Sequence, residues 1–347
     1  MKGRGTDMAP PNRFERLHVE LEPDDDAPPL EKVPTVFYRD ASRSILAENE
    51  SPDVPFRWSL NPYRGCEHGC VYCYARPSHE QLGFNAGLDF ETRIMVKDDA
   101  PALLRKTFLS PRWTPDVVSL SGNTDCYQPV ERTLGITRRC LEVFAEFRNP
   151  VGVITKSALV ARDADLLGEL ARHGATHVFC SITSLDPDLA ARMEPRAARP
   201  HRRLEALATL AAAGIPVAVM IGPVLPGLND EEIPRILEAA RRAGASSASW
   251  VLLRLASPLD AIFARWLEEH FPEKRSRVLN RIRDTRGGRI NDSTWGRRQR
   301  GQGAYAEQIG QLFRAAARKH GLDRPLPALR SDAFRRPPRP GEQLTLL

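Results

Sequence analysis

The chain lacks any long apolar segment. Its 347 residues contain no run of eighteen or more apolar side chains, the length that a membrane-spanning helix needs. The first fifteen residues are polar and hold no apolar stretch of the kind found in a signal peptide. These two absences predict a cytoplasmic protein with no membrane association.

Cysteine is scarce and unevenly placed. Of the 6 cysteines, three lie within residues 66–73 and the others are scattered singly. The cysteines of a secreted, disulfide-bonded fold would be spread along the chain and not concentrated in eight residues. We therefore expect reduced thiols and a metal site. Because no second cysteine cluster exists, we expect no auxiliary metal cluster.

An excess of either charge is also absent over most of the chain, since the formal net charge is only +6. Residues 274–301 are the exception, with ten Lys or Arg against Asp284 and Asp292, a local excess of 10 − 2 = +8. This segment has two interpretations that the sequence leaves open. It can attract nucleic acid by counterion release, or it can be a solvated helical surface.

Short β-rich runs alternate with helical patterns along the middle of the chain. A strand before Cys66 is followed by runs at 117–120, 151–155, 177–183, 216–222 and 249–255, each leading into a helical segment. Repeated strand–helix units of this length are βαβ crossovers, which build a parallel sheet. We therefore predict an α/β fold, a partial (β/α)6 TIM-like barrel, with a doubly wound sheet as the second choice.

The regions outside this core differ in composition. Residues 1–55 are rich in Pro and acidic side chains without a sustained apolar period, which predicts an extended, irregular N-terminal arm. The predicted organisation is this arm, a core at 56–258, a basic helical C-terminal extension at 259–330 and a flexible tail at 331–347. The working face of the core should lie at the C-terminal ends of its strands.

Residues 61–74 are the most informative part of the chain. They place Cys66, Cys70 and Cys73 in a C-x3-C-x2-C spacing. Three thiolates on one loop match three irons of a [4Fe–4S] cluster and leave the fourth iron open for a small ligand. The alternative is a structural zinc site completed by His68 or a distant histidine, but the chain has no second C-x2-C or H-x3-H hook.

This spacing, with the aromatic Tyr72 directly before the last cysteine, resembles the hallmark of the radical S-adenosylmethionine (radical SAM) superfamily. The resemblance implies a [4Fe–4S] cluster whose open iron binds the amino and carboxylate groups of S-adenosylmethionine. It further implies reductive cleavage of that cofactor to a 5′-deoxyadenosyl radical, which abstracts a hydrogen atom from the substrate. An electron donor such as flavodoxin or ferredoxin is then also expected.

By the same resemblance, cofactor contacts are expected at the ends of later strands. Asp125 stands where the family usually has a glutamate for the methionyl amino group. Hydroxyls and Lys156 suit the ribose and the methionyl carboxylate, and Gly222 begins a segment where the family packs adenine. The full expected set is Tyr72, Ser121, Gly122, Asn123, Thr124, Asp125, Lys156, Ser157, Ser181, Thr183 and Gly222. Polar strand ends also occur without any function.

Longer phrases resemble the branch related to spore photoproduct lyase: NPYRGC (61–66), GNTDCYQPVE (122–131), MEPR (193–196) and PGLND (226–230). The N-terminal GRG (3–5) resembles a bacterial group named simply as radical SAM proteins. The resemblance implies a lyase-like DNA repair reaction with a cysteine as hydrogen donor. Cys126 and Cys180 are the candidates, whereas Cys140 falls on the apolar face of a helix and is expected in the core.

The chain ends in a Pro- and Arg-rich segment followed by Gln343 to Leu347 (QLTLL). These five residues resemble the peptide by which bacterial DNA enzymes dock on the replication sliding clamp. The alternative is an apolar terminus folded back on the body.

Taken together, the motifs predict a radical SAM enzyme that acts on nucleic acid. Two alternatives remain open: radical modification of a protein or small metabolite, and an iron–sulfur or zinc module that binds nucleic acid without turnover.

Overall fold

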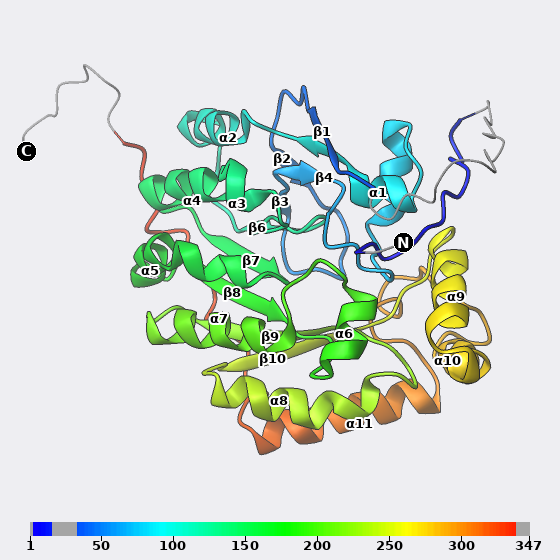
Figure 1. Ribbon diagram of the computed structural model, residues 1–347. Helices are drawn as coiled ribbons and strands as arrows, with labels where there is room; N and C mark the ends of the chain where they lie inside the picture. The colour runs from blue at the N-terminus through cyan, green and yellow to red at the C-terminus, as the bar shows by residue number, and fades with distance from the viewer. Residues whose placement is uncertain (1–2, 16–32, 338–347) are drawn as a thin grey trace, which may run out of the picture.

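The computed structural model describes residues 3–15 and 33–337, and its centre is a seven-stranded sheet (Figure 1). The strand order is β10-β9-β8-β7-β6-β3-β2, and all neighbours are parallel except β2 and β3. Its strands are β2 (Leu46–Glu48), β3 (Trp58–Leu60), β6 (Val118–Leu120), β7 (Val151–Thr155), β8 (Thr176–Ser181), β9 (Val217–Val224) and β10 (Ser247–Leu252).

The six parallel strands overlap the six runs predicted from the sequence. They follow one another across the sheet in chain order, without the reversal that defines a doubly wound sheet. The sheet is open, because its edge strands β10 and β2 do not pair. The predicted partial barrel is therefore confirmed, and the doubly wound alternative is wrong.

Helices follow the strands and cover one face of the sheet (Figure 1). They are α2 (Ala100–Leu109), α3 (Glu131–Leu134), α4 (Ile136–Phe147), α5 (Ala164–Arg172), α6 (Pro187–Met193), α7 (Pro200–Ala212) and α8 (Ile233–Arg242). In α4 the apolar side chains recur at helical spacing, and Ile136, Cys140 and Phe147 are all fully buried against the sheet. The expected core position of Cys140 is thus what the structure shows.

Two short strands lie within residues 1–55, for which the sequence predicted an extended arm. One is β2 at the edge of the large sheet, and the other is β1 (Val36–Arg39). β1 pairs with β5 (Arg93–Val96), which also pairs with β4 (Tyr63–Arg64), in a separate three-stranded sheet. Helix α1 (Leu88–Thr92) and the 3-10 helix η1 (Arg76–Leu82) connect this sheet to the loop that carries the three cysteines.

The C-terminal part adds three helices: α9 (Leu259–His270), α10 (Arg275–Asp284) and α11 (Ala304–Lys319). α9 and α10 pack on each other, and α11 lies along α8 (Figure 1). Within residues 3–15 and 33–337 there are three more 3-10 helices: η2 (Ala158–Asp163), η3 (Asp230–Glu232) and η4 (Pro272–Lys274). No helix among the described residues is long and apolar enough to cross a membrane.

Candidate functional site

The three cysteines lie on a loop that follows β4 and spans the carboxyl ends of the parallel strands. Cys66 and Cys70 are 6% and 7% exposed, and Cys73 is partly buried. The loop turns tightly at Gly69, which has a φ of +68°, and Val71 N donates to the carbonyl of Met193 beyond β8 (3.0 Å). The loop is therefore fixed to the sheet edge where a partial barrel carries its site.

A buried ion pair supports the loop from one side. Arg76 and Glu91 are both fully buried and meet at 2.5 Å, and Arg76 Nε donates to the carbonyl of Cys70 (3.0 Å). The other Glu91 oxygen accepts the backbone N–H of Gly5 (2.9 Å), so residues 3–15 lie against the loop. Burial raises the pKa of Glu91, and Arg76 opposes that rise.

The two phrases GNTDCYQPVE and MEPR support the loop from the other side. Glu67, next to Cys66, accepts from the backbone N–H of Val130 (2.8 Å) and from Arg196 (3.0 Å). Gln128 Oε1 accepts the backbone N–H of Glu67 (2.8 Å). These motif residues therefore serve first to hold the cysteine loop in place.

Asp125, expected at the methionyl amino group, lies partly buried beside His68 of the loop. One oxygen accepts from Thr155 Oγ1 (2.7 Å) and Tyr127 N (2.9 Å), and the other accepts from Lys156 N (2.8 Å) and lies 3.4 Å from His68 Nδ1. Burial alone would raise its pKa, but His68 and these hydrogen bonds hold it well below its usual range. Both oxygens already have protein partners, so Asp125 joins the loop to the ends of β6 and β7.

The rest of the predicted SGNTD segment forms a tight turn. Ser121 has a φ of +81°, and its Oγ donates to the carbonyl of Thr124 (2.7 Å). Asn61 Oδ1 accepts the N–H groups of Asn123 (2.8 Å) and Thr124 (3.2 Å). Only the Asn123 side chain is exposed in this turn, while the carbonyl of Gly122 accepts from Tyr74 (2.6 Å).

A buried polar network lies behind Tyr72. The Tyr72 hydroxyl donates to Glu194, Thr183 Oγ1 donates to the same carboxylate oxygen (2.7 Å), and Arg203 pairs with the other oxygen. Lys156 Nζ lies 5.8 Å from the centre of the Tyr72 ring. The network therefore places two predicted cofactor residues, Tyr72 and Thr183, against one carboxylate.

Glu194 and Arg203 were not predicted as site residues. The MEPR phrase that contains Glu194 was singled out only as a family signature, and nothing in the sequence marks Arg203. Arg203 also donates to the carbonyl of Ser181 (3.0 Å) at the end of β8, whose side chain is buried. Glu194 lies at the end of α6 and Arg203 lies within α7, so their contact depends on how the two helices are placed and only the fold reveals it.

The remaining predicted cofactor residues are spread along the strand ends. Ser157 Oγ caps η2 by accepting the N–H of Leu159 (3.3 Å). Gly222 lies within β9 and precedes Asn229, which links two strand ends by donating to the carbonyls of Thr183 (2.7 Å) and Pro223 (3.1 Å). The structure therefore brings Thr183 and the segment after Gly222 together.

The two candidate hydrogen donors are both buried. Cys126 is 0% exposed below the Ser121 turn, and Cys180 is 2% exposed near the end of β8. Burial raises the pKa of the Cys180 thiol to about 12. Their role as donors stays a prediction.

The donor set on the loop suits an iron–sulfur cluster. Cys73 packs against two apolar clusters, one containing Cys70 and the other Cys66. Burial raises the pKa of all three thiols, and neighbouring cysteines of the loop raise the pKa of Cys66 and Cys70 further. Metal coordination reverses such a rise because the metal's charge deprotonates a coordinating thiol.

A single metal ion needs several ligands that converge on one point, whereas the ligands of a cluster bind separate metal atoms. Among residues 3–15 and 33–337, no three His, Cys, Asp or Glu side chains converge on one point where they could hold a metal ion. In a [4Fe–4S] cluster, by contrast, each thiolate binds its own iron. The three thiols therefore fit a cluster by their chemistry and by their common loop.

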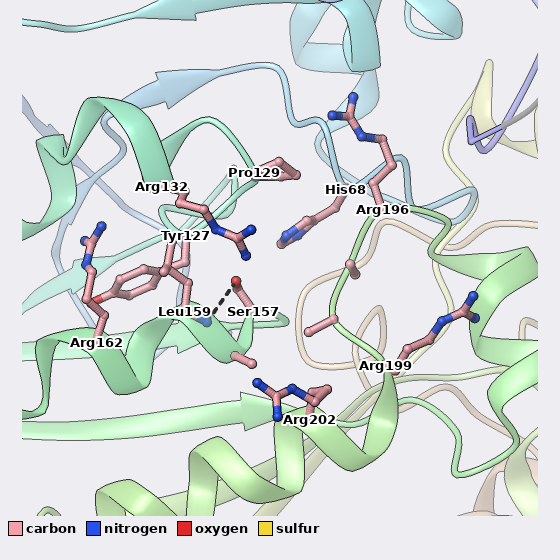
Figure 2. Close-up of a pocket in the computed structure, with 13 residues that line it drawn as sticks. His68, Tyr127, Pro129, Arg132, Ser157, Leu159, Arg162, Arg196, Arg199 and Arg202 are labelled. Carbon is pink, nitrogen blue, oxygen red and sulfur yellow. Dashed lines mark hydrogen bonds between the residues drawn. The ribbon is translucent and has the colours of Figure 1, made fainter. Parts of the chain in front are cut away.

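A cavity of about 660 Å³ opens beside the cysteine loop (Figure 2). Its lining residues come from the loop itself and from the segments that follow β6, β7 and β8. They are His68, Tyr127, Pro129, Arg132, Ser157, Ala158, Leu159, Arg162, Arg196, Ala197, Ala198, Arg199 and Arg202. Two residues predicted or weighed as ligands, His68 and Ser157, thus share a wall with five arginines.

Several arginines of the basic segment 274–301 serve the fold. Arg286 is buried and donates to the carbonyl of Leu253 (2.6 Å), and Arg300 donates to the carbonyl of Trp250 (2.6 Å). Others, including Arg277, Arg283 and Arg289, are exposed. The segment is therefore neither wholly a solvated helical surface nor wholly free for a partner. The predicted clamp-docking residues Gln343 to Leu347 lie outside the described part of the chain.

The family model described as "Radical SAM superfamily" matches residues 60–240. An uncharacterized protein of Mycobacterium tuberculosis (strain ATCC 25618 / H37Rv) is 37% identical over 226 residues, which are 65% of this chain and 66% of that protein. An uncharacterized protein of Methanocaldococcus jannaschii is 26% identical over 225 residues, 65% of this chain and 80% of that protein. The chain therefore spans 66% of the length of the mycobacterial relative that it matches.

Solved structures of spore photoproduct lyase share the fold. The lyase complexed with dinucleoside spore photoproduct aligns with a TM-score of 0.57 and 17% identity, over 82% of this chain and 79% of that chain. A double mutant of the lyase, with bound AdoMet and dinucleoside spore photoproduct, aligns with a TM-score of 0.55 and 18% identity, over 82% and 78% of the two chains. At this identity the likeness is one of fold.

Proposed function

Because this chain belongs to the Radical SAM superfamily, we propose that it is an S-adenosylmethionine-dependent radical enzyme that abstracts a hydrogen atom from a nucleic-acid substrate. The family implies a [4Fe–4S] cluster and S-adenosylmethionine as cofactors. When bound, they supply the reductive cleavage that yields a 5′-deoxyadenosyl radical, which takes a hydrogen atom from a substrate C–H bond. The reaction we propose is lyase-like, as in DNA repair, with an external one-electron donor such as flavodoxin or ferredoxin.

One observation carries the proposal: three thiols, two buried and one partly buried, share a single loop at the carboxyl edge of the parallel sheet. Cys66, Cys70 and Cys73 are assigned as the cluster ligands, because thiolates are the protein ligands of such clusters. The buried pair of Arg76 and Glu91 holds the loop from one side. Asp125 is assigned a positioning role, because both its oxygens are already bonded.

Lys156 is the residue we assign to the methionyl carboxylate. It follows the end of β7, and among the described residues its ammonium group has no carboxylate within ion-pair distance, only the Tyr72 ring at 5.8 Å. A cation at a strand end is therefore available to a carboxylate ligand. We also propose that the cofactor is contacted by Tyr72, Ser181, Thr183 and Gly222.

Two exposed aromatic side chains with arginines nearby support a nucleic-acid substrate. Tyr74 directly follows Cys73, is 54% exposed, and has the Arg254 guanidinium 5.7 Å from its ring centre. Trp295 is 60% exposed, and the N–H of its neighbour Gly296 donates to Asp53, which also pairs with Arg298. Aromatic faces beside cations are the usual means of binding unpaired bases.

The first experiment tests the radical chemistry. We would reconstitute the protein anaerobically with iron and sulfide, add dithionite and S-adenosylmethionine, and assay 5′-deoxyadenosine. The native protein should produce it, and a Cys66→Ala, Cys70→Ala, Cys73→Ala triple variant should not. A Cys140→Ala variant is the matched control, because its thiol is also buried but lies on α4, away from the loop. A folded, four-iron native protein that makes no deoxyadenosine would overturn the proposal.

The substrate class needs its own readout. Ultraviolet-damaged DNA labelled with deuterium should transfer deuterium to 5′-deoxyadenosine if the substrate is DNA. If deuterium transfer is absent from every DNA and RNA tested while deoxyadenosine still forms, the nucleic-acid assignment fails and the radical assignment stands.

A further inference from the structure

The cavity beside the cysteine loop has an unusual lining. Among residues 3–15 and 33–337, its lining holds Arg132, Arg162, Arg196, Arg199 and Arg202, and no Asp or Glu. Its volume of about 660 Å³ is within the range of ordinary ligand sites. Figure 2 shows the Arg132 and Arg202 side chains entering the same space as His68 and Ser157.

Two of the five arginines form ion pairs with carboxylates that do not line the cavity. Arg162 pairs with Glu131 (2.9 Å) and with Asp163 (2.8 Å), and Arg196 pairs with Glu67 (3.0 Å). All three carboxylates are buried outside the cavity wall. The positive charges of these two arginines are therefore balanced by buried carboxylates, and their main role is to hold the cavity wall in place.

The other three are available to a ligand. In the described part of the chain, the Arg132 side chain makes neither a hydrogen bond nor an ion pair, and the Arg199 side chain donates only to the carbonyl of Pro187 (3.0 Å). Arg202 pairs with Glu205 at the surface, where both side chains are more than half exposed. A surface pair of that kind is weak and exchanges readily for a stronger anion.

The backbone adds to the positive potential. Helix α7 begins at Pro200, between the lining residues Arg199 and Arg202, and no side chain caps its first turn, which contains no acidic residue. Helix N-termini usually carry Asp or Glu because their free N–H groups and the helix dipole favour negative charge. This one carries Arg199 and Arg202 instead, so the cations and the helix end all favour an anion in the cavity.

We propose that this cavity binds phosphate groups of the substrate, with Arg132 and Arg202 as the principal contacts. The inference rests on the proposed function for its choice of a nucleic acid. His68 belongs both to the cavity wall and to the loop between Cys66 and Cys70, so a phosphate held here lies next to the proposed site of chemistry. Arginine is the side chain best shaped to bind phosphate through paired N–H groups.

The test compares two double variants that lose the same charge. R132Q/R202Q removes the cavity contacts. R265Q/R318Q is the control, because Arg265 has an exposed i,i+3 partner like Arg202, and Arg318 is exposed and has no partner among the described residues, like Arg132. Neither α9 nor α11 lines the cavity. Thermal unfolding shows first that both variants fold.

Binding of a labelled single-stranded oligonucleotide to the reconstituted protein is then followed by fluorescence anisotropy at several salt concentrations. The slope of log K against log[salt] is negative, and each lost phosphate contact reduces its magnitude by about 0.7, so two lost contacts should reduce it by about 1.4 in the cavity variant. Its affinity at low salt should fall at least about tenfold, since two charge-assisted contacts are lost. The control should keep the native slope.

Competition identifies the source of the phosphate. Displacement by unlabelled oligonucleotide and not by AMP assigns the cavity to the phosphodiester backbone, and displacement by AMP assigns it to a terminal phosphate. Equal slopes for both double variants, or no binding of either compound by the native protein, would overturn the proposal. If deoxyadenosine never forms but binding depends on Arg132 and Arg202, the phosphate site stands and the radical function fails.

Discussion

At the scale of single residues, Glu194 shows how a charge is held beside the apolar cysteine loop. Its two oxygens take hydrogen bonds from Tyr72, Thr183 and Arg203, and the side chain is buried. Burial alone would raise the pKa of Glu194, but the charges of Arg203 and Lys156 bring it down to about 2. The carboxylate therefore stays ionised and keeps Tyr72 fixed.

This arrangement predicts a stability difference that depends on pH. The folded pKa of about 2 lies below the ordinary 4.5, so Glu194 contributes stability that is fully present above pH 4.5 and is lost as the pH falls toward 2. Glu194→Gln should lower the Tm of the apoprotein at pH 7, since breaking a buried pair costs roughly 3–5 kcal/mol. The Tm gap between native and variant should narrow as the pH falls.

Calorimetry from pH 7 to acid pH measures that gap. Glu268→Gln is the control, because Glu268 forms only an exposed pair with Arg265 (3.8 Å) and should change Tm little at any pH. A gap for Glu194→Gln that stays constant down to pH 3 would show that the pair is not held ionised.

The sequence predicted which residues gather at this site better than it predicted what they do. Spacing and strand ends placed the cysteines, Asp125 and Lys156 at one edge of the sheet. The partners of Asp125 depend on a loop from another part of the chain, as do the contacts of Glu194 with Tyr72 and Thr183. A single sequence has no signal for such contacts, because they depend on how loops cross after the sheet has formed.

At the scale of elements, the extended segment 3–15 acts as a support for the cysteine loop. Gly5 N donates to Glu91 (2.9 Å), and a Cβ on Gly5 would lie 1.8 Å from the carbonyl oxygen of Gly69. Arg13 pairs with the buried Glu80 of η1 (2.5 Å). The backbone of this segment can therefore approach the cysteine loop closely at residue 5 because that residue is a glycine.

Gly5→Ala should separate this segment from the loop. The added methyl group meets backbone, which cannot move aside as a side chain can, and overpacking of this kind costs roughly 1–3 kcal/mol. We expect a lower Tm and faster loss of iron from the reconstituted protein when a chelator is added.

Gly168→Ala on α5 is the control, because a Cβ at Gly168 meets only the carbonyl oxygen of Ala213 at 3.8 Å, an ordinary van der Waals contact. Iron retention followed by absorbance distinguishes the two variants. Equal retention in both would mean that residues 3–15 do not support the loop.

Element prediction succeeded where the physical signal was strong. The parallel strands are buried on both faces, so their apolar runs stand out from the polar turns between them. The three-stranded sheet was missed, because β4 has only two residues and β1 is mostly exposed. Strands this short show no period, and their pairing with β5 depends on the rest of the fold.

At the scale of the whole molecule, the basic segment bridges the two edges of the open sheet. On one side, Leu252 N at the end of β10 donates to the carbonyl of Gln299 (2.7 Å). On the other side, Asp53 lies in the loop between β2 and β3. It accepts a hydrogen bond from Gly296 N (2.7 Å) and forms an ion pair with Arg298. The basic segment, which the sequence suggested for binding nucleic acid, therefore also links the two edges of the open sheet.

Asp53→Asn should therefore loosen this bridge without touching the cysteines. Two contacts to Asp53 depend on its charge or its acceptor oxygens, and only one of the two oxygens remains after the change. We expect limited trypsin digestion between Arg289 and Arg300 to become several-fold faster, with the iron content of the reconstituted protein unchanged.

Asp332→Asn is the matched control, because Asp332 forms an exposed pair with Arg330 (2.5 Å) that joins no two parts of the barrel. Peptide mapping locates the cleavage, and the rate is compared at one protease concentration. If cleavage speeds up equally in both variants, the bridge carries no local stability. Faster cleavage in Asp53→Asn alone would show that the arginines of this segment are held by the fold, which leaves the arginine-lined cavity as the more accessible site for a polyanion.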